Sequence, residues 1–394
     1  MRSGVMTTSA LESLVLLLRE RGYRVVGPQV RDGTIVYDEL TSSAALPRGW
    51  RDVQAPGRVA LERRDDEALF GYAVGASGWK RELFPPRQRL WEAVSDGDAS
   101  FHVLEAPDPG QPLAFLGVRP CELAAIGIQD RVFLHGLAED RVYAGHRRGL
   151  VLIAVECHAP AATCFCTSIG TGPGLDLEED GPRAAGSAVH ATTPPPAVPD
   201  LVLTELLDGE HRLLVRAATA EGDELLAALE RREVTTDDLA ARAASLEAAQ
   251  AAIGRHVEVD GLRELLLGNL SHPRWDDVAA RCLTCTNCTL ACPTCFCSTT
   301  EDTTDLTGEH AFHDRRWDSC FTLEFTHTGP ASVRTSTRSR YRQWLTHKLA
   351  TWIDQFDTTG CVGCGRCIAW CPVGIDLTEE VAAIRATDGR EVTT

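Results

Sequence analysis

Two short stretches near the C-terminus decide how this chain folds. Residues 282–293 read Cys282-Leu-Thr-Cys285-Thr-Asn-Cys288-Thr-Leu-Ala-Cys292-Pro293, and residues 361–372 read Cys361-Val-Gly-Cys364-Gly-Arg-Cys367-Ile-Ala-Trp-Cys371-Pro372. Both stretches fit the spacing C-x2-C-x2-C-x3-C-P, in which three cysteines of a tight loop bind one [4Fe–4S] cluster. The fourth cysteine lies one helical turn later and binds the other cluster of the pair. The repeat therefore predicts a ferredoxin-like domain with two [4Fe–4S] clusters.

Because the two motifs exchange their last cysteines, the predicted ligands fall into two sets. The first set is Cys282, Cys285, Cys288 and Cys371, and the second set is Cys361, Cys364, Cys367 and Cys292. Gly363 and Gly365 are expected to leave room for backbone N–H groups beside the second cluster. Thr284 and Thr286 stand at the matching positions of the first motif, so the two reduction potentials could differ.

Structural zinc is the competing interpretation, since four-thiolate zinc sites also use C-x2-C pairs. Zinc ribbons have two separated pairs, whereas this chain repeats an unbroken run of four cysteines with its proline. The spacing therefore favours iron–sulfur clusters over zinc.

Four further cysteines follow predicted strands. The apolar runs Leu113–Val118 and Leu150–Val155 read as buried strands with a helix at Glu122–Ile128 between them, which is a βαβ pattern. Ligands of parallel sheets lie beyond the carboxyl ends of the strands. A possible third iron–sulfur site there consists of Cys121, Cys157, Cys164 and Cys166. The alternative is that these thiols pack as small buried side chains, as free cysteines commonly do.

The remaining cysteines, Cys295, Cys297 and Cys320, have no role that the spacing decides. They could contribute to a site, or they could pack around the first cluster.

The length of 394 residues exceeds the usual size of a single core and predicts two domains. Residues 1–255 are expected to form a mixed α/β domain with a Gly/Pro-rich loop at 170–199 and a helical segment at 220–253. Residues 256–394 are expected to form an α-helical, bacterial-ferredoxin-like domain with two [4Fe–4S] clusters and an insertion at 298–360.

Within the first domain, the apolar pattern predicts a helix over residues 9–21. Short β-like runs suit a mixed or antiparallel sheet, and they are Thr34–Tyr37, Arg58–Leu61 and Leu69–Val74. A hairpin is expected at Asp208-Gly209, joining Leu201–Leu207 to Arg212–Ala217.

The insertion contains a cluster of basic residues on a predicted helix. These residues are Arg334, Arg338, Arg340, Arg342, His347 and Lys348. The cluster could dock an acidic partner, although charge runs of this kind are more often solvated helix faces.

Composition excludes several classes of function. The net charge of −17 would repel nucleic acid and anionic lipid. The apolar run Leu14–Leu18 is far too short to span a membrane and lacks the flanks of a secretory signal. With 15 cysteines and no secretory signal, the chain is expected to be cytoplasmic and to use its thiols for metal or redox chemistry.

The motifs together resemble a known family. They are Gly117-Val-Arg-Pro-Cys121-Glu, Cys164-Phe-Cys166-Thr-Ser-Ile-Gly-Thr-Gly-Pro173, Cys292-Pro-Thr-Cys-Phe-Cys297, Trp317-Asp-Ser-Cys320 and Cys361-Val-Gly-Cys-Gly-Arg-Cys-Ile. Over nearly its whole length, the chain resembles the iron–sulfur β subunit of soluble hydrogenase/sulfur reductase (sulfhydrogenase) complexes. The iron–sulfur subunit of anaerobic sulfite reductase is similar to the same family and shares its dicluster domain. One departure is the longer acidic and Ala/Pro-rich segment after Pro173.

The resemblance implies a non-catalytic electron-transfer subunit of an oxidoreductase complex. Its partners would be a flavin subunit that exchanges electrons with NAD(P)H and a [NiFe]-hydrogenase module of a small and a large subunit. In the sulfite reductase branch the catalytic partner would be a sirohaem protein. A further alternative is a sulfur-reducing subunit whose own site is the set at Cys121, Cys157, Cys164 and Cys166.

Overall fold

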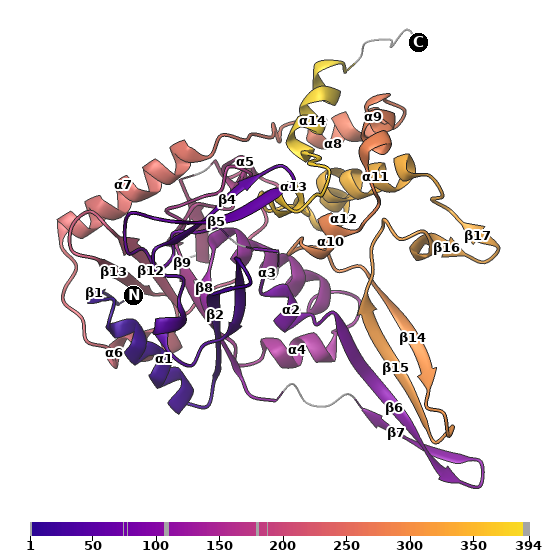
Figure 1. Ribbon diagram of the computed structural model, residues 1–394, viewed down its shortest axis with the longest axis horizontal. Helices are drawn as coiled ribbons and strands as arrows, with labels where there is room; N and C mark the ends of the chain where they lie inside the picture. Colours follow the sequence, from indigo (N-terminus) through magenta and orange to yellow (C-terminus); the bar gives the residue numbers. More distant parts are fainter. Residues whose placement is uncertain are drawn as a thin grey trace.

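The centre of the molecule is a seven-stranded mixed sheet. The computed structural model describes residues 2–73, 75–76, 78–105, 110–178, 181–186 and 188–388. The strand order in this sheet is β1-β13-β12-β9-β8-β2-β3 (Figure 1). Its strands are β1 (Ser3–Thr7), β2 (Arg24–Arg31), β3 (Thr34–Glu39), β8 (Leu113–Val118), β9 (Val151–Val155), β12 (Leu201–Leu206) and β13 (Arg212–Ala217). Strands β2, β8, β9 and β12 are parallel, and the outer pairs are antiparallel, so the predicted mixed α/β class is confirmed.

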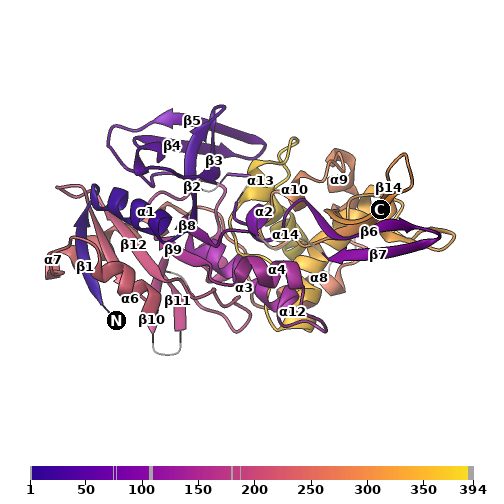
Figure 2. The same ribbon diagram turned by 90° about the horizontal axis from the view of Figure 1, so that it is seen from below.

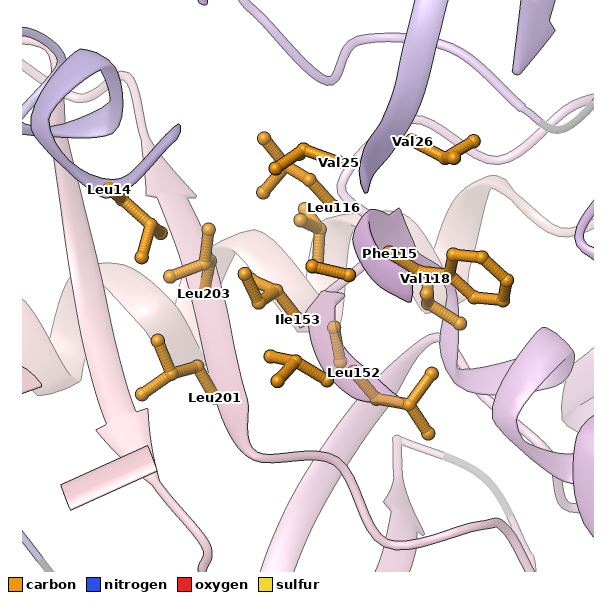
Figure 3. Close-up of a cluster of buried hydrophobic side chains, with 14 of the residues drawn as sticks. Leu14, Val25, Val26, Phe115, Leu116, Val118, Leu152, Ile153, Leu201 and Leu203 are labelled. Atoms are coloured by element: carbon orange, nitrogen blue, oxygen red, sulfur yellow. The ribbon is translucent and has the colours of Figure 1, made fainter. Parts of the chain in front are cut away.

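The predicted βαβ unit is present at the middle of this sheet. Strand β8 leads into helix α3 (Pro120–Phe133), which leads into β9, and the two strands pair in parallel. Every residue of both strands is buried. Figure 3 shows side chains of these strands, such as Leu116 and Ile153, in one buried cluster that also contains Leu14 of helix α1 (Ala10–Glu20). Strands covered on both faces carry continuous apolar runs, which is why the sequence revealed them.

Two helices cover opposite faces of the outer strands. Leu214 of β13 packs in a small cluster beside Ala241 of helix α7 (Thr236–Ala252). Leu213 belongs instead to the main core, together with Leu225 of helix α6 (Ala220–Ala227). Since successive side chains of a strand point to opposite faces, α6 and α7 lie on different sides of the sheet. The predicted hairpin and helices of this region are confirmed.

Two local expectations were wrong. Residues 69–73 do not form a strand (Val74 lies outside the described residues), because Leu69 and Phe70 donate their backbone N–H groups to the carboxylate of Glu205 at 2.6 and 2.9 Å. A side chain thus takes the hydrogen bonds that a sheet would have used. The region 170–199 is also not wholly irregular, since it contains the hairpin β10 (Gly174–Glu178) and β11 (Gly181–Ala185). The run Arg58–Leu61, by contrast, lies in β5 (Arg58–Arg63), which pairs with β4 (Trp50–Ala55).

A four-stranded sheet joins the two halves of the chain. Its order is β14-β15-β6-β7, from β6 (Arg87–Gly97), β7 (Ser100–Glu105), β14 (Ser298–Thr304) and β15 (His310–Trp317). It projects from the body at the lower right of Figure 1. Because β15 of the predicted insertion pairs with β6, the insertion is structurally continuous with the N-terminal half.

The C-terminal part is a group of short helices around a second core. They are α8 (Leu262–Gly268), α9 (Arg274–Arg281), α10 (Asn287–Leu290), α11 (Thr337–Thr346), the π-helical turn η3 (His347–Thr351), α12 (Trp352–Phe356), α13 (Arg366–Ala369) and α14 (Leu377–Ala386). Buried Trp275, Trp344 and Ile368 belong to this core. Figure 2 shows this group beside helix α3 of the βαβ unit. Among the described residues, no helix combines the length and apolar character needed to cross a membrane.

Candidate iron–sulfur centre

The first predicted ligand set surrounds one cavity. Cys282, Cys285, Cys288 and Cys371 all line it, together with Cys367 of the second set and the aromatic residues Phe321, Tyr341 and Trp344, and the cavity volume is about 30 Å³. Helices α10 and α13, which end the two motif loops, pack against each other. The last cysteine of the second motif is therefore brought to the loop of the first, as the spacing predicts.

The cysteines of the second predicted set also lie close together, and they are more deeply buried than those of the first set. Burial, and then the neighbouring Cys361, Cys364 and Cys292 sulfurs, raise the pKa of the Cys367 thiol well above its usual value. Cys361 and Cys292 are buried, and burial raises the pKa of Cys361 to about 12. A hydrogen bond from Cys295 instead lowers the pKa of Cys292 well below its usual value. Metal ligands of this type must be thiolates, so iron would displace the protons that Cys361 and Cys367 otherwise retain.

The residues present fit iron–sulfur clusters. Each set contains four thiols from both motifs, and backbone N–H groups point at sulfur in each, from Thr284 to Cys282 at 3.4 Å and from Gly363 to Cys361 at 3.4 Å. Such N–H donors stabilise the negative charge of a thiolate-ligated cluster. In the described part of the chain, no three Cys, His, Asp or Glu side chains are grouped closely enough to hold a single metal ion.

The two motif loops have the same backbone bend but different surroundings. Gly363 and Gly365 have positive φ angles of 65° and 72°, and Thr284 and Thr286 have values of 51° and 69°. A Cβ added at Gly363 would lie 2.6 Å from backbone atoms of Cys166, and one at Gly365 would lie 2.2 Å from the Thr163 carbonyl oxygen. The glycines of the second motif therefore have a second role besides letting N–H groups approach sulfur. They leave space for the neighbouring loop at residues 163–166 to pack against the motif.

Lys348 is not part of a surface patch, contrary to the sequence-based interpretation. Its side chain is buried, and its Nζ donates to Cys292 Sγ at 3.2 Å, Thr294 Oγ1 at 3.0 Å and the Gly360 carbonyl at 3.0 Å. Burial lowers the pKa of Lys348, but the Cys292 and Cys295 sulfurs outweigh it and hold this pKa well above its usual value. An ammonium group thus lies beside a predicted ligand of the second cluster.

The rest of the basic cluster is only partly free. Arg340 donates to the Phe321 carbonyl at 2.8 Å, Arg342 to the Leu270 carbonyl at 2.5 Å, and Arg338 pairs with Asp276 at 3.2 Å. These contacts brace helix α11 against α9 and the adjoining loops, so the helix has a structural role.

The three unassigned cysteines lie near two buried lysines. Cys295 Sγ is 3.6 Å from Lys348 Nζ. A hydrogen bond from Cys320 lowers the pKa of Cys297 to about 7, although burial opposes this shift, and the charges of Lys348 and Lys80 lower it further. Cys295 therefore lies beside Cys292 of the second set, whereas Cys320 is also within electrostatic reach of Cys288 in the first set.

The possible third set also converges on one cavity. Cys121, Cys157, Cys164 and Cys166 line it together with Cys364 of the second motif, and the cavity volume is about 30 Å³.

Sequence reasoning missed the charged groups that connect the halves at this centre. Glu122 and Arg366, both almost fully buried, form an ion pair between helix α3 and the second motif. Trp79 Nε1 also donates to Glu122 at 2.9 Å. The only signal in the sequence was an acidic residue directly after Cys121 and a basic one directly before Cys367, which alone does not pair them.

The class of protein follows from this arrangement and from one family comparison. Residues 281–375 match the family model described as "4Fe-4S dicluster domain", so this part of the chain is similar to a class of iron–sulfur domains.

A comparison with curated proteins covers almost the entire chain. The chain is 29% identical over 376 residues to the protein named "Sulfhydrogenase 2 subunit beta" of Pyrococcus furiosus, which covers 93% of this chain and 94% of that protein. The resemblance to the iron–sulfur β subunits of sulfhydrogenases is thereby confirmed. No solved structure matches the chain significantly.

Proposed function

We propose that this chain is the iron–sulfur subunit that relays electrons between a flavin NAD(P)H-oxidoreductase subunit and a [NiFe]-hydrogenase module. The observation that carries the proposal is the cavity that is lined by three cysteines of the first motif and by the last cysteine of the second, with Cys367 also in its wall. This exchange is the arrangement of two-cluster ferredoxins. The two [4Fe–4S] clusters would each supply a one-electron carrier, and the ligand sets would be Cys282, Cys285, Cys288 and Cys371, and Cys361, Cys364, Cys367 and Cys292.

The first ligand set lies near the surface of the molecule, and the second lies in its interior. Cys285 is exposed, and Leu283 beside it is 60% exposed, so the first set lies where a partner can approach. Val362 and Arg366 of the second motif are almost fully buried, which shields the second set from water. The cytoplasmic location and the identity of the partners remain parts of this proposal.

The relay can be tested in the complex purified through a tag on this chain. We expect Cys288→Ala to remove about four irons per chain. It should abolish NAD(P)H-dependent hydrogen formation but preserve hydrogen formation from an artificial dye that reduces the hydrogenase module directly. Ser339→Ala, at a partly exposed position of α11 outside both ligand sets, is the control and should change neither reaction.

Several outcomes would contradict the proposal. Normal NAD(P)H-dependent hydrogen formation by the Cys288→Ala complex would exclude a role for the first set. A purified complex that reduces sulfite instead would favour the sulfite reductase alternative. NADPH-dependent polysulfide reduction by the isolated chain would show that it has a catalytic site of its own.

A further inference from the structure

We infer that the α/β domain holds a third [4Fe–4S] cluster, bound by Cys121, Cys157, Cys164 and Cys166. This site deepens the proposed relay, but its existence can be measured as iron content without any partner. Failure of the relay and failure of this site are therefore distinguishable.

The four cysteines come from separate parts of the fold and meet in one place. Cys121 is in the first turn of α3, directly after β8, and Cys157 follows β9. Cys164 and Cys166 are contributed by the loop that leads into the short helix α5 (Cys166–Ile169). Since β8 and β9 are adjacent and parallel, their carboxyl ends lie at one edge of the sheet, where parallel sheets place their ligands.

The thiols surround a hollow, which distinguishes this site from ordinary packing. Its cavity volume is about 30 Å³, the same as the value at the first ferredoxin set. Protein interiors are otherwise packed to the density of organic crystals, so small thiols that merely filled the core would close around one another. The similar size of the two hollows indicates a similar occupant.

Cys364 is a fifth thiol in the wall, and its place in the chain assigns it elsewhere. It is the middle cysteine of the second motif, between Cys361 and Cys367, and these three are the loop ligands of a ferredoxin cluster. The four remaining thiols are the number that one [4Fe–4S] cluster needs. Two cluster sets would then share a wall at Cys364.

The cavity also has a buried cation with unused hydrogen-bonding capacity. Arg119 lines the cavity, and its side chain is 2% exposed. The guanidinium donates to the carbonyls of Phe70 at 2.6 Å, Tyr72 at 2.9 Å and Glu156 at 3.1 Å, while its buried Nε has no partner among the described residues. A cluster with four thiolates is negative, so this guanidinium would offset part of the cost of burying that charge.

The surrounding loop is held in place by the second motif. Phe165 donates its backbone N–H to the Gly363 carbonyl at 2.8 Å, and Thr171 Oγ1 donates to the Val362 carbonyl at 2.7 Å. The missing side chains of Gly363 and Gly365 make this approach possible. The cysteines of the loop are thus oriented by rigid contacts, which a cluster site requires.

The test is an iron and acid-labile sulfide count on the anaerobically purified full chain. We expect about twelve irons per chain in the wild type, from three clusters of four. The double variant Cys164→Ser/Cys166→Ser should lose about one third of the iron and sulfide. Ser339→Ala, on helix α11 and outside the three sets, is expected to retain all of the iron and sulfide.

Folding is followed by circular dichroism and thermal unfolding in the same samples. A wild-type count of about eight irons would overturn the inference, as would a folded double variant with the wild-type count. If the double variant does not fold, the wild-type count decides alone, with Cys157→Ser as the second variant expected to lose about four irons.

Discussion

Lys348 is the residue whose role changes most between sequence and structure. In the sequence it belongs to a basic run. In the fold the residue lies in the π-helical turn η3, and its ammonium group contacts Cys292 Sγ. Such π-helical turns within helices occur frequently at functional sites. The turn directs the side chain inward, where a positive charge stabilises a thiolate-ligated cluster, more so after reduction.

Replacement of Lys348 by Met is expected to lower the reduction potential of the cluster that Cys292 binds. A loss of about 1.4 kcal/mol of stabilisation in the reduced state corresponds to about 60 mV for one electron. A redox titration monitored by electron paramagnetic resonance would measure the shift. Lys348→Arg keeps the charge and should stay near the wild-type potential. An unchanged midpoint in a Lys348→Met protein with full iron content would refute the role.

At the scale of elements, the two motif loops share a backbone conformation but differ in what packs against them. Both loops need positive φ angles, but only the second loop is packed against residues 163–166. The threonines of the first loop accept a modest backbone strain, because the space around that loop is open enough for side chains.

Substitutions at matching positions of the two loops should therefore differ in their effect on stability and iron content. Gly365→Ala places a Cβ against the Thr163 carbonyl and should lower the unfolding temperature and the iron content. The matching change Thr286→Gly removes a side chain from a left-handed position and should alter the free energy of unfolding by no more than about 1 kcal/mol. Thermal unfolding and iron analysis of both variants would measure this contrast, and equal effects would argue against it.

A buried ion-pair network around Glu156, the residue directly after β9, joins α7 to the sheet. Its carboxylate accepts hydrogen bonds from Arg242 at 2.7 and 2.9 Å, Arg216 at 2.9 Å and Thr204 at 2.6 Å. Burial raises the pKa of Glu156, but the hydrogen bonds and charges of Arg242 and Arg216 outweigh burial and hold this pKa below its usual value.

Because the pKa of Glu156 is lowered in the folded state, the contribution of its ion pairs to stability depends on pH. It is fully present above the usual glutamate pKa of about 4.5 and is lost as the pH falls through the lower value of the folded state. Glu156→Gln removes the buried carboxylate that Arg216 and Arg242 share, although Arg242 keeps its ion pair with Asp176, and should cost up to about 3 kcal/mol at neutral pH. The variant should also lose less stability than the wild type on acidification, which thermal unfolding across a pH series would measure. Glu62→Gln, in an exposed pair with Arg51, should change stability by less than about 1 kcal/mol.

At the scale of the whole molecule, the ferredoxin-like part is not an independent unit. Strand β15 pairs with β6, Arg366 pairs with Glu122, and Lys80 Nζ donates to the Cys292 carbonyl at 3.2 Å. Contacts from the N-terminal half therefore complete the surroundings of the second ligand set. The predicted boundary near residue 255 separates patterns of sequence more clearly than it separates cores.

A fragment of residues 256–394 should accordingly hold less iron and unfold at a lower temperature than the full chain. Its strand β15 and the buried Arg366 would lose their partners. Co-expression with residues 1–255 should restore both properties. A stable fragment with about eight irons would show that the dicluster part folds alone.

The sequence by itself determined the features that depend on neighbours along the chain. The spacing of the two cysteine motifs indicated the dicluster domain, and the apolar runs at β8 and β9 indicated a parallel βαβ unit. The helices α1 and α7 were also predicted, because periodicity and N-caps such as Thr235 are local signals.

Only the tertiary structure decided which distant groups meet. It brought Cys121, Cys157, Cys164 and Cys166 around one hollow, buried Lys348 beside Cys292, and paired Glu122 with Arg366. It also closed β6 and β15 into one sheet across more than half of the chain. Such contacts depend on how the packed elements close long loops, and no local pattern of residues records that geometry.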